Sequence, residues 1–175
     1  MEGLTGFSFI KTEVLIDVNQ GEIAMINRGL IRIWGKDAKI RKRTLNARIE
    51  SLNEKPAYRN SVENRCLVIA NGYYEWQWKD AKGKEKQKFL ITPKDQELFA
   101  FAGIYSSWTN PETNELVNSY SIVTTEANEL MSEIHNHKKR MPVVLKKKDR
   151  QSWLSGLEVS RFAFPYEVKL NAKAV

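Results

Sequence analysis

Short apolar runs separated by turn residues are the feature of this sequence that most constrains its fold. An apolar run over 66–70 is followed by the turn pair Asn71-Gly72 and then by an aromatic run over 73–78. Runs of this length and spacing are typical of paired strands. Further strands are expected at 88–91, 98–108 and 120–123, with loops at 80–83 and 110–114. We therefore predict an α+β fold, β-rich, with a curved, barrel-like antiparallel sheet and a few flanking helices.

Apolar residues at the spacing of an amphipathic helix occur in only a few segments. Residues 127–134 carry apolar side chains at i, i+3, i+4 and i+7, and Thr125 is the expected N-cap of this helix. A shorter helix is expected over 149–155, closed by Gly156. A weaker pattern over 47–53 predicts a third. With 175 residues and no repeat or linker, we predict a single domain over 1–175.

The charge is strongly basic, with a net charge of +7 and a pI near 9.4. A basic chain favours a polyanion partner without requiring one. The basic residues form three clusters, at 36–43, 79–88 and 138–150. We interpret the middle cluster as a solvated hairpin whose lysines protect strand edges. For the other two, a solvated loop and a contact with backbone phosphates remain open alternatives.

Several classes of protein are excluded or disfavoured. No apolar run is long enough to span a bilayer, and the N-terminus lacks a signal-peptide pattern. The single cysteine excludes an internal disulfide and a Cys-rich zinc site, and it fits a reducing compartment. No phosphate-binding, dinucleotide-binding or zinc motif is present. We expect a cytoplasmic protein with no membrane contact, no metal and no cofactor.

Four residues are candidates for chemistry. Cys66 lies in an apolar run, so a buried structural role is favoured over that of a nucleophile. Glu75 lies among aromatic residues, where a carboxylate is costly unless it is paired or functional. General acid catalysis and an exposed strand face remain open for it. His135 and His137 follow the predicted helix, where helix capping is the simpler interpretation, and their spacing is not that of a metal pair.

Several motifs in a fixed order resemble one family. They lie at 46–51, 55–59, 65–76, 101–105, 123–135 and 140–145. Together, over residues 23–170, they resemble the SRAP family (SOS response-associated peptidase, also called abasic site processing protein). The resemblance implies protection of abasic sites in single-stranded DNA. In that family the α-amine and thiol of a cysteine at position 2 condense with the ring-opened sugar aldehyde, giving a thiazolidine DNA–protein crosslink.

The resemblance also implies roles for individual residues. Glu75 would assist sugar ring opening and Schiff-base formation, His135 would be the second proton-transfer group, and Asn46 would orient the reactive N-terminus. Contacts with DNA would come from Arg48, Trp34, Lys36, Thr124 and Arg140. The implied partner is single-stranded DNA that contains an abasic site, bound by a monomer without a small-molecule cofactor.

The sequence departs from this family at its beginning. Position 2 is Glu2, and the first cysteine is Cys66. The segment ahead of Gly29 is shorter than in the family, and residues 28–32 read Arg-Gly-Leu-Ile-Arg where the family usually has Trp-Gly-Leu-Ile-Pro. An N-terminally truncated product and a diverged member remain open alternatives. We predict that crosslinking is lost or impaired. A non-catalytic DNA-binding module and an inactive remnant are the other hypotheses, and a remnant would fold poorly around an unpaired strand edge.

Overall fold

A closed sheet of five strands forms the centre of the computed structural model, which describes residues 11–17, 22–95 and 97–175. Glu2, on which the crosslinking prediction depends, lies outside these ranges. The five strands are β1 (Lys11–Asp17), β2 (Glu22–Arg28), β4 (Arg65–Ala70), β7 (Phe99–Thr109) and β8 (Leu116–Glu126). They run in the order β7-β4-β1-β2-β8, and β8 pairs again with β7, which closes the ring. The barrel-like sheet predicted from the sequence is confirmed.

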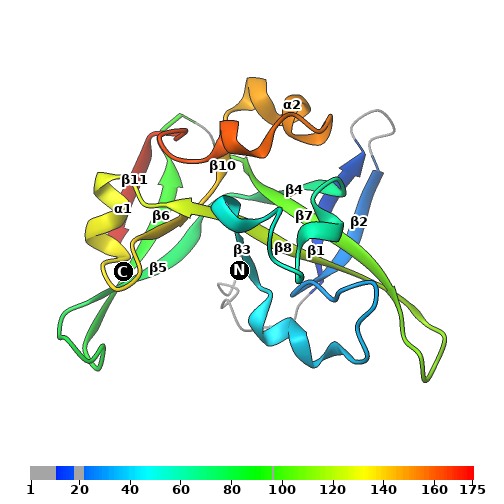
Figure 1. The fold of residues 1–175 in the computed structure, drawn as a ribbon. Coiled ribbons are helices and arrows are strands. Elements are labelled where there is room, and N and C mark those ends of the chain that lie inside the picture. Colours follow the sequence, from blue (N-terminus) through cyan, green and yellow to red (C-terminus); the bar gives the residue numbers. More distant parts are fainter. Residues whose placement is uncertain (1–10, 18–21, 96) are drawn as a thin grey trace.

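Short strands extend the ring, and a second sheet packs beside it (Figure 1). On β8 lie β3 (Asn46–Arg48), which is parallel to it, and β9 (Arg140–Pro142), which is antiparallel. A further short strand, β10 (Val144–Leu145), pairs with β7. The β2–β8 pairing is also parallel, so the sheet is not antiparallel throughout. The second sheet is β11 (Leu170–Ala174), β6 (Lys86–Pro93) and β5 (Tyr73–Trp78), with β6 in the middle.

Helices are few and short. Within residues 11–17, 22–95 and 97–175, the α-helices are α1 (Glu129–Ile134) and α2 (Arg150–Leu154). The 3-10 turns are η1 (Ala38–Arg43), η2 (Ile49–Ser51), η3 (Arg59–Ser61), η4 (Lys147–Asp149) and η5 (Val159–Phe162). In the part of the chain that the structure describes, no helix is long and apolar enough to cross a membrane.

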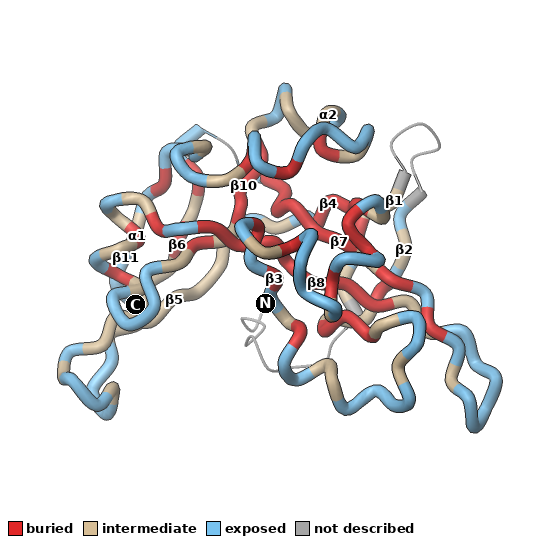
Figure 2. The backbone as a smooth tube through the Cα atoms, in the orientation of Figure 1, coloured by how far each residue is buried: buried red, intermediate tan, exposed pale blue. Residues whose placement is uncertain are grey.

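Two apolar cores use opposite faces of the ring strands. Figure 2 shows buried residues along these strands. Val68 and Cys66 belong to one core, together with side chains of α1 and the second sheet. Leu67, between them, belongs to the other core, with Trp153 of α2. The Trp153 indole donates hydrogen bonds to the carbonyls of Cys66 (3.2 Å) and Gly103 (3.3 Å). Alternation along β4 therefore assigns neighbouring residues to different cores.

The predicted helices are partly corrected. The helix at 149–155 is confirmed as α2, with Gly156 following it at φ +84°. The N-cap of α1 is Asn128, whose Oδ1 accepts from the Met131 amide at 2.9 Å, and Thr125 instead lies in β8. The helix expected at 47–53 is wrong: residues 46–48 form β3 because they pair with β8, and only a 3-10 turn follows.

Candidate functional site

Glu75 and His135 come together from different elements. Glu75 lies on β5, opposite Phe89 of β6, and His135 is the C-cap of α1, where its amide donates to the Met131 carbonyl at 2.8 Å. Glu75 Oε2 and His135 Nδ1 are 4.0 Å apart, and the side chains are 21% and 24% exposed, respectively. The pair is therefore partly shielded from water and still accessible to a ligand.

The hydrogen bonds of His135 define which ring nitrogen is available. Nδ1 lies 2.7 Å from the carbonyl oxygen of Arg140. A carbonyl oxygen only accepts, so Nδ1 carries the hydrogen, and the neutral ring presents Nε2 as a base. Glu75 Oε1 accepts from the Trp76 amide at 3.0 Å, which fixes the carboxylate and leaves Oε2 toward the histidine. This geometry suits proton exchange with a bound reactant.

Arg140 lies in a network on β8 and β9. One of its terminal nitrogens donates to Glu50 Oε2 (3.0 Å) and to the carbonyl (2.9 Å) and hydroxyl (3.1 Å) of Thr124. Its side chain is only 14% exposed. Burial lowers the pKa of Arg140, and the Glu50 carboxylate opposes that shift. These contacts tie β9 to β8 and hold the Arg140 carbonyl against His135.

Glu50 contacts Arg48 and Arg140, two of the predicted DNA-binding residues, although no role was predicted for it from the sequence. Its Oε2 is 3.7 Å from Arg48 Nε, and its Oε1 accepts from the Thr125 hydroxyl (3.0 Å) and the Glu126 amide (3.1 Å). Partial burial raises the pKa of Glu50, but hydrogen bonds from its own backbone amide and from Arg140 outweigh that effect, so the pKa is lowered. The Arg48-x-Glu50 spacing was visible in the sequence, but the link to Arg140 was not.

Asn46 occupies the same exposed face of β3 as Arg48, because Ala47 between them is buried. Its side-chain oxygen accepts from Arg28 Nη2 at 3.2 Å, and its backbone carbonyl accepts from the Tyr58 hydroxyl at 2.9 Å. Burial lowers the pKa of Arg28. The arginine at position 28 thus places a guanidinium group on the amide of Asn46.

Trp34 and Lys36 lie in the loop between β2 and η1. Trp34 is 53% exposed, and the Arg32 guanidinium stands 4.0 Å from its ring centroid. The Trp108 indole donates to the Gly35 carbonyl at 2.6 Å. This loop is therefore anchored on β7, whereas Glu75 and His135 are anchored on β5 and α1. The contacts of Trp34 and Lys36 with DNA stay a prediction.

Cys66 is fully buried in β4, and burial raises the pKa of its thiol. The interpretation as a structural residue is confirmed. Among the described residues, no three His, Cys, Asp or Glu side chains gather as a group that would hold a metal ion.

The fold and the site define a class of protein: a small closed β-barrel with a carboxylate–imidazole pair beside arginine-bearing strands. Residues 9–174 match the sequence profile of the family described as SOS response associated peptidase (SRAP). The chain belongs to this family, as its motifs indicated.

Named relatives and solved structures agree with this assignment. The abasic site processing protein YoqW of Bacillus subtilis (strain 168) is 40% identical over 143 residues, which are 81% of this chain and 61% of YoqW. The abasic site processing protein HMCES of Xenopus tropicalis is 30% identical over 151 residues, covering 74% of this chain and 43% of HMCES. This chain thus spans less than two thirds of these relatives. A crystal structure of a Bacteroides thetaiotaomicron protein superposes with a TM-score of 0.89 at 33% identity, covering 98% and 76% of the two chains.

Proposed function

We propose that this chain binds single-stranded DNA at abasic sites and that Glu75 and His135 act on the deoxyribose of the lesion. The names of the relatives support the target, since YoqW and HMCES are both abasic site processing proteins. The observation that carries the proposal is the 4.0 Å approach of Glu75 and His135, with Nδ1 of the histidine held by a backbone carbonyl.

The chemistry that this pair serves is opening of the sugar. An abasic deoxyribose is a hemiacetal, and its opening to an aldehyde removes a proton from the C1′ hydroxyl and adds one to the ring oxygen. One group of the pair accepts the first proton while the other, in its protonated form, donates the second. In the tautomer that donates from Nδ1 to the Arg140 carbonyl, the accepting nitrogen of His135 is Nε2, and the carboxyl of Glu75 is the partner in the exchange.

The neighbouring residues divide into two roles under this proposal. Arg48, Trp34 and Lys36 are exposed and contact the DNA backbone or a base. Arg140 and Thr124 are nearly buried, so they act at the edge of the DNA site, mainly by positioning His135. Asn46, on the same face as Arg48, keeps the orienting role that the family resemblance implies.

We further propose that the chain as printed binds without forming a thiazolidine crosslink. That product needs an accessible thiol next to an amine, and the only cysteine, Cys66, is fully buried. The second hypothesis, a non-catalytic single-stranded DNA-binding module, predicts instead equal binding to abasic and intact DNA. The closed five-strand ring gives no support to a remnant with an unpaired sheet. A monomer in the cytoplasm stays our prediction from the sequence.

The test compares single-stranded DNA carrying one abasic site with intact DNA of the same sequence, on native and denaturing gels. We expect a native-gel complex that prefers abasic DNA and no adduct on the denaturing gel. Glu75→Gln should retain binding but slow sugar opening, measured by trapping the aldehyde with a hydroxylamine probe. Glu2→Cys tests whether a thiol at that position restores the adduct. Equal binding to intact DNA would refute abasic-site recognition, and an adduct with the unaltered chain would refute the loss of crosslinking.

A further inference from the structure

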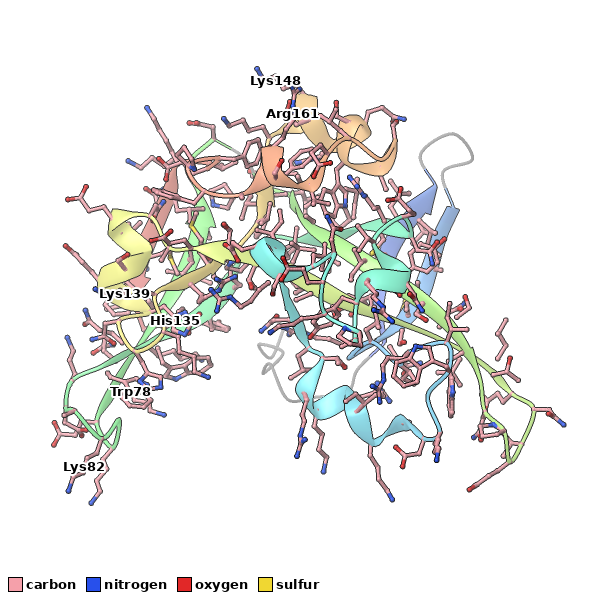
Figure 3. All side chains as sticks on the ribbon, in the orientation of Figure 1. Trp78, Lys82, His135, Lys139, Lys148 and Arg161 are labelled. Atoms are coloured by element: carbon pink, nitrogen blue, oxygen red, sulfur yellow. The ribbon has the colours of Figure 1, made fainter. Side chains whose placement is uncertain are left out.

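The β5–β6 hairpin and the turn after α1 form one basic surface, although they are distant in the sequence. Figure 3 shows Lys139 near His135. Trp78 lies between this pair and Lys82, which is at the far end of the hairpin. The two segments, 79–88 and 136–139, contain two carboxylates and seven lysines, namely Lys79, Lys82, Lys84, Lys86, Lys88, Lys138 and Lys139. One of the carboxylates, Asp80, accepts from the amides of Lys82 (2.7 Å) and Lys84 (3.1 Å) and so shapes the loop.

The turn after α1 holds the hairpin in place. Asn136 makes two hydrogen bonds with the backbone of Trp78: its Oδ1 accepts from the amide at 3.0 Å and its Nδ2 donates to the carbonyl at 2.9 Å. The imidazole of His137 stacks on the Trp78 ring, with centroids 3.7 Å apart and planes inclined by 10°. Gln77 adds a hydrogen bond to the Glu133 carbonyl at 2.9 Å. The lysines are therefore carried on an anchored support.

The hairpin loop also packs on Trp78. Gly83, at φ +63°, lies so close to the indole that an added Cβ would stand 2.6 Å from it. The Lys86 ammonium is 5.3 Å from the centroid of the same ring. This packing holds the backbone of the loop that carries Lys82 and Lys84 against Trp78.

Edge protection does not account for the lysines at the hairpin tip. Lys82 and Lys84 lie in the loop between β5 and β6, outside both strands, whereas Lys86 lies on β6 beyond the residues that pair with β11, which are 89–93. The edge of β5 at Trp78 is already covered by Asn136. The interpretation of the hairpin lysines as edge protectors therefore stays a prediction for Lys86 and does not apply to Lys82 and Lys84.

We propose that this hairpin surface binds the phosphate backbone of the DNA strand that carries the lesion, several nucleotides away from it. The inference rests on the proposed function, because it places Glu75 and His135 at the abasic site. β5 continues from Glu75 to Trp78, and the loop then carries Lys82; at about 3.3 Å per residue, the seven steps from Glu75 to Lys82 span at most about 23 Å. A stacked DNA strand with one phosphate per ~3.4 Å covers that distance in at most about seven nucleotides.

The test uses single-stranded DNA with one central abasic site and flanks of either about 3 or about 12 nucleotides, chosen from this spacing. The variant is Lys82→Gln/Lys84→Gln, whose side chains are exposed. The matched control is Lys148→Gln/Arg161→Gln, which removes the same charge at exposed positions far from the hairpin (Figure 3). Affinity is measured by fluorescence anisotropy from about 50 to 200 mM salt, and thermal melting checks that all variants fold.

Loss of two phosphate contacts should reduce the slope of log K against log[salt] by about 1.4, since each contact with a single strand contributes ~0.7. On the long DNA, the wild type should therefore lose about sevenfold more affinity across this salt range than the hairpin variant. On the short DNA the wild type and the hairpin variant should have the same slope. The control should have the slope of the wild type on both DNAs. An unchanged slope on the long DNA, an equal change on the short DNA, or an equal change in the control would each overturn the proposal.

Failure of the proposed function would look different. If the wild type binds abasic and intact DNA equally, abasic-site recognition is wrong, whatever the hairpin does. The difference between the hairpin variant and its control on long DNA still decides whether the hairpin binds the phosphate backbone.

Discussion

Replacing Glu50 by Gln tests the network that positions the site. The carboxylate accepts a charge-assisted hydrogen bond from Arg140 at 3.0 Å and lies 3.7 Å from Arg48 Nε. A hydrogen bond to a charged group contributes about 1.5–3 kcal/mol when it is shielded from water. The Glu50 side chain is 38% exposed, so solvent screening reduces the expected contribution to about 1 kcal/mol. Gln retains an acceptor for Thr125 and the Glu126 amide.

We therefore expect Glu50→Gln to lower the free energy of unfolding at pH 7 by about 1 kcal/mol, or the melting temperature by about 2–4 °C. The folded-state pKa of Glu50 is lowered from its usual 4.5, so its contribution is present above pH 4.5 and is lost as the pH falls through the folded-state pKa. The difference between variant and wild type should shrink accordingly.

Urea unfolding at several pH values between about 7 and 3.5 measures this difference. Glu112→Gln, in the β7–β8 loop, is the control and should leave stability unchanged. A Glu50→Gln loss that is the same at both ends of the pH range would refute the reasoning, because it would show that the charge of Glu50 is not what stabilises the fold. A Glu50→Gln variant that is as stable as the wild type at pH 7 would refute the reasoning as well.

Three further predictions concern the fold. The thiol of Cys66 should react with a thiol reagent only on unfolding, because it is fully buried and its pKa is raised; fast labelling of the native protein would contradict this. Gly29→Ala should cost more than 1 kcal/mol in urea unfolding, since Gly29 has φ +91° and its Cβ would stand 2.6 Å from the Arg41 carbonyl oxygen. Asn128→Ala should cost about 1 kcal/mol by loss of the cap on the Met131 amide, whereas Asn128→Asp should retain most of the stability.

The strands between 65 and 109 could be predicted because their partners are near in the sequence. β5 and β6 pair as a hairpin. β4 and β7 pair with each other, and each contains a short apolar run that marks it as a strand in the sequence. β1 gave no such signal. Val14 faces one core and the adjacent Leu15 packs against the other, so β1 lacks the alternation of a strand with one exposed face. Its closure of the ring depends on pairing with β4, far along the chain.

The segment after residue 46 shows how tertiary pairing overrides a local pattern. Ile49 and Leu52 are buried, and their i, i+3 spacing is compatible with one face of a helix. In the structure the parallel pairing of Ala47 with Val123 keeps the first residues extended. That pairing also aligns Asn46 and Arg48 on one exposed face, which a helix would have separated.

Glu75 and His135 could be assigned to one site only through the family resemblance, because nothing in their spacing along the sequence indicates that they are in contact. The choice between His135 and His137 has a structural explanation. The backbone leaves the helix at His135, and Asn136 then caps the edge of β5. His135 is left beside Glu75, and His137 reaches Trp78.

One turn therefore supports both the acid–base pair and the hairpin surface. The Lys139 amide donates to the His135 carbonyl at 2.8 Å, and Asn136 and His137 between them hold Trp78. Replacing Asn136 or Trp78 would disturb the position of His135 as well as that of the hairpin. A loss of DNA binding in such a variant would not distinguish the two. The exposed lysines at the hairpin tip avoid this problem, because removing their charge leaves every contact of the turn in place.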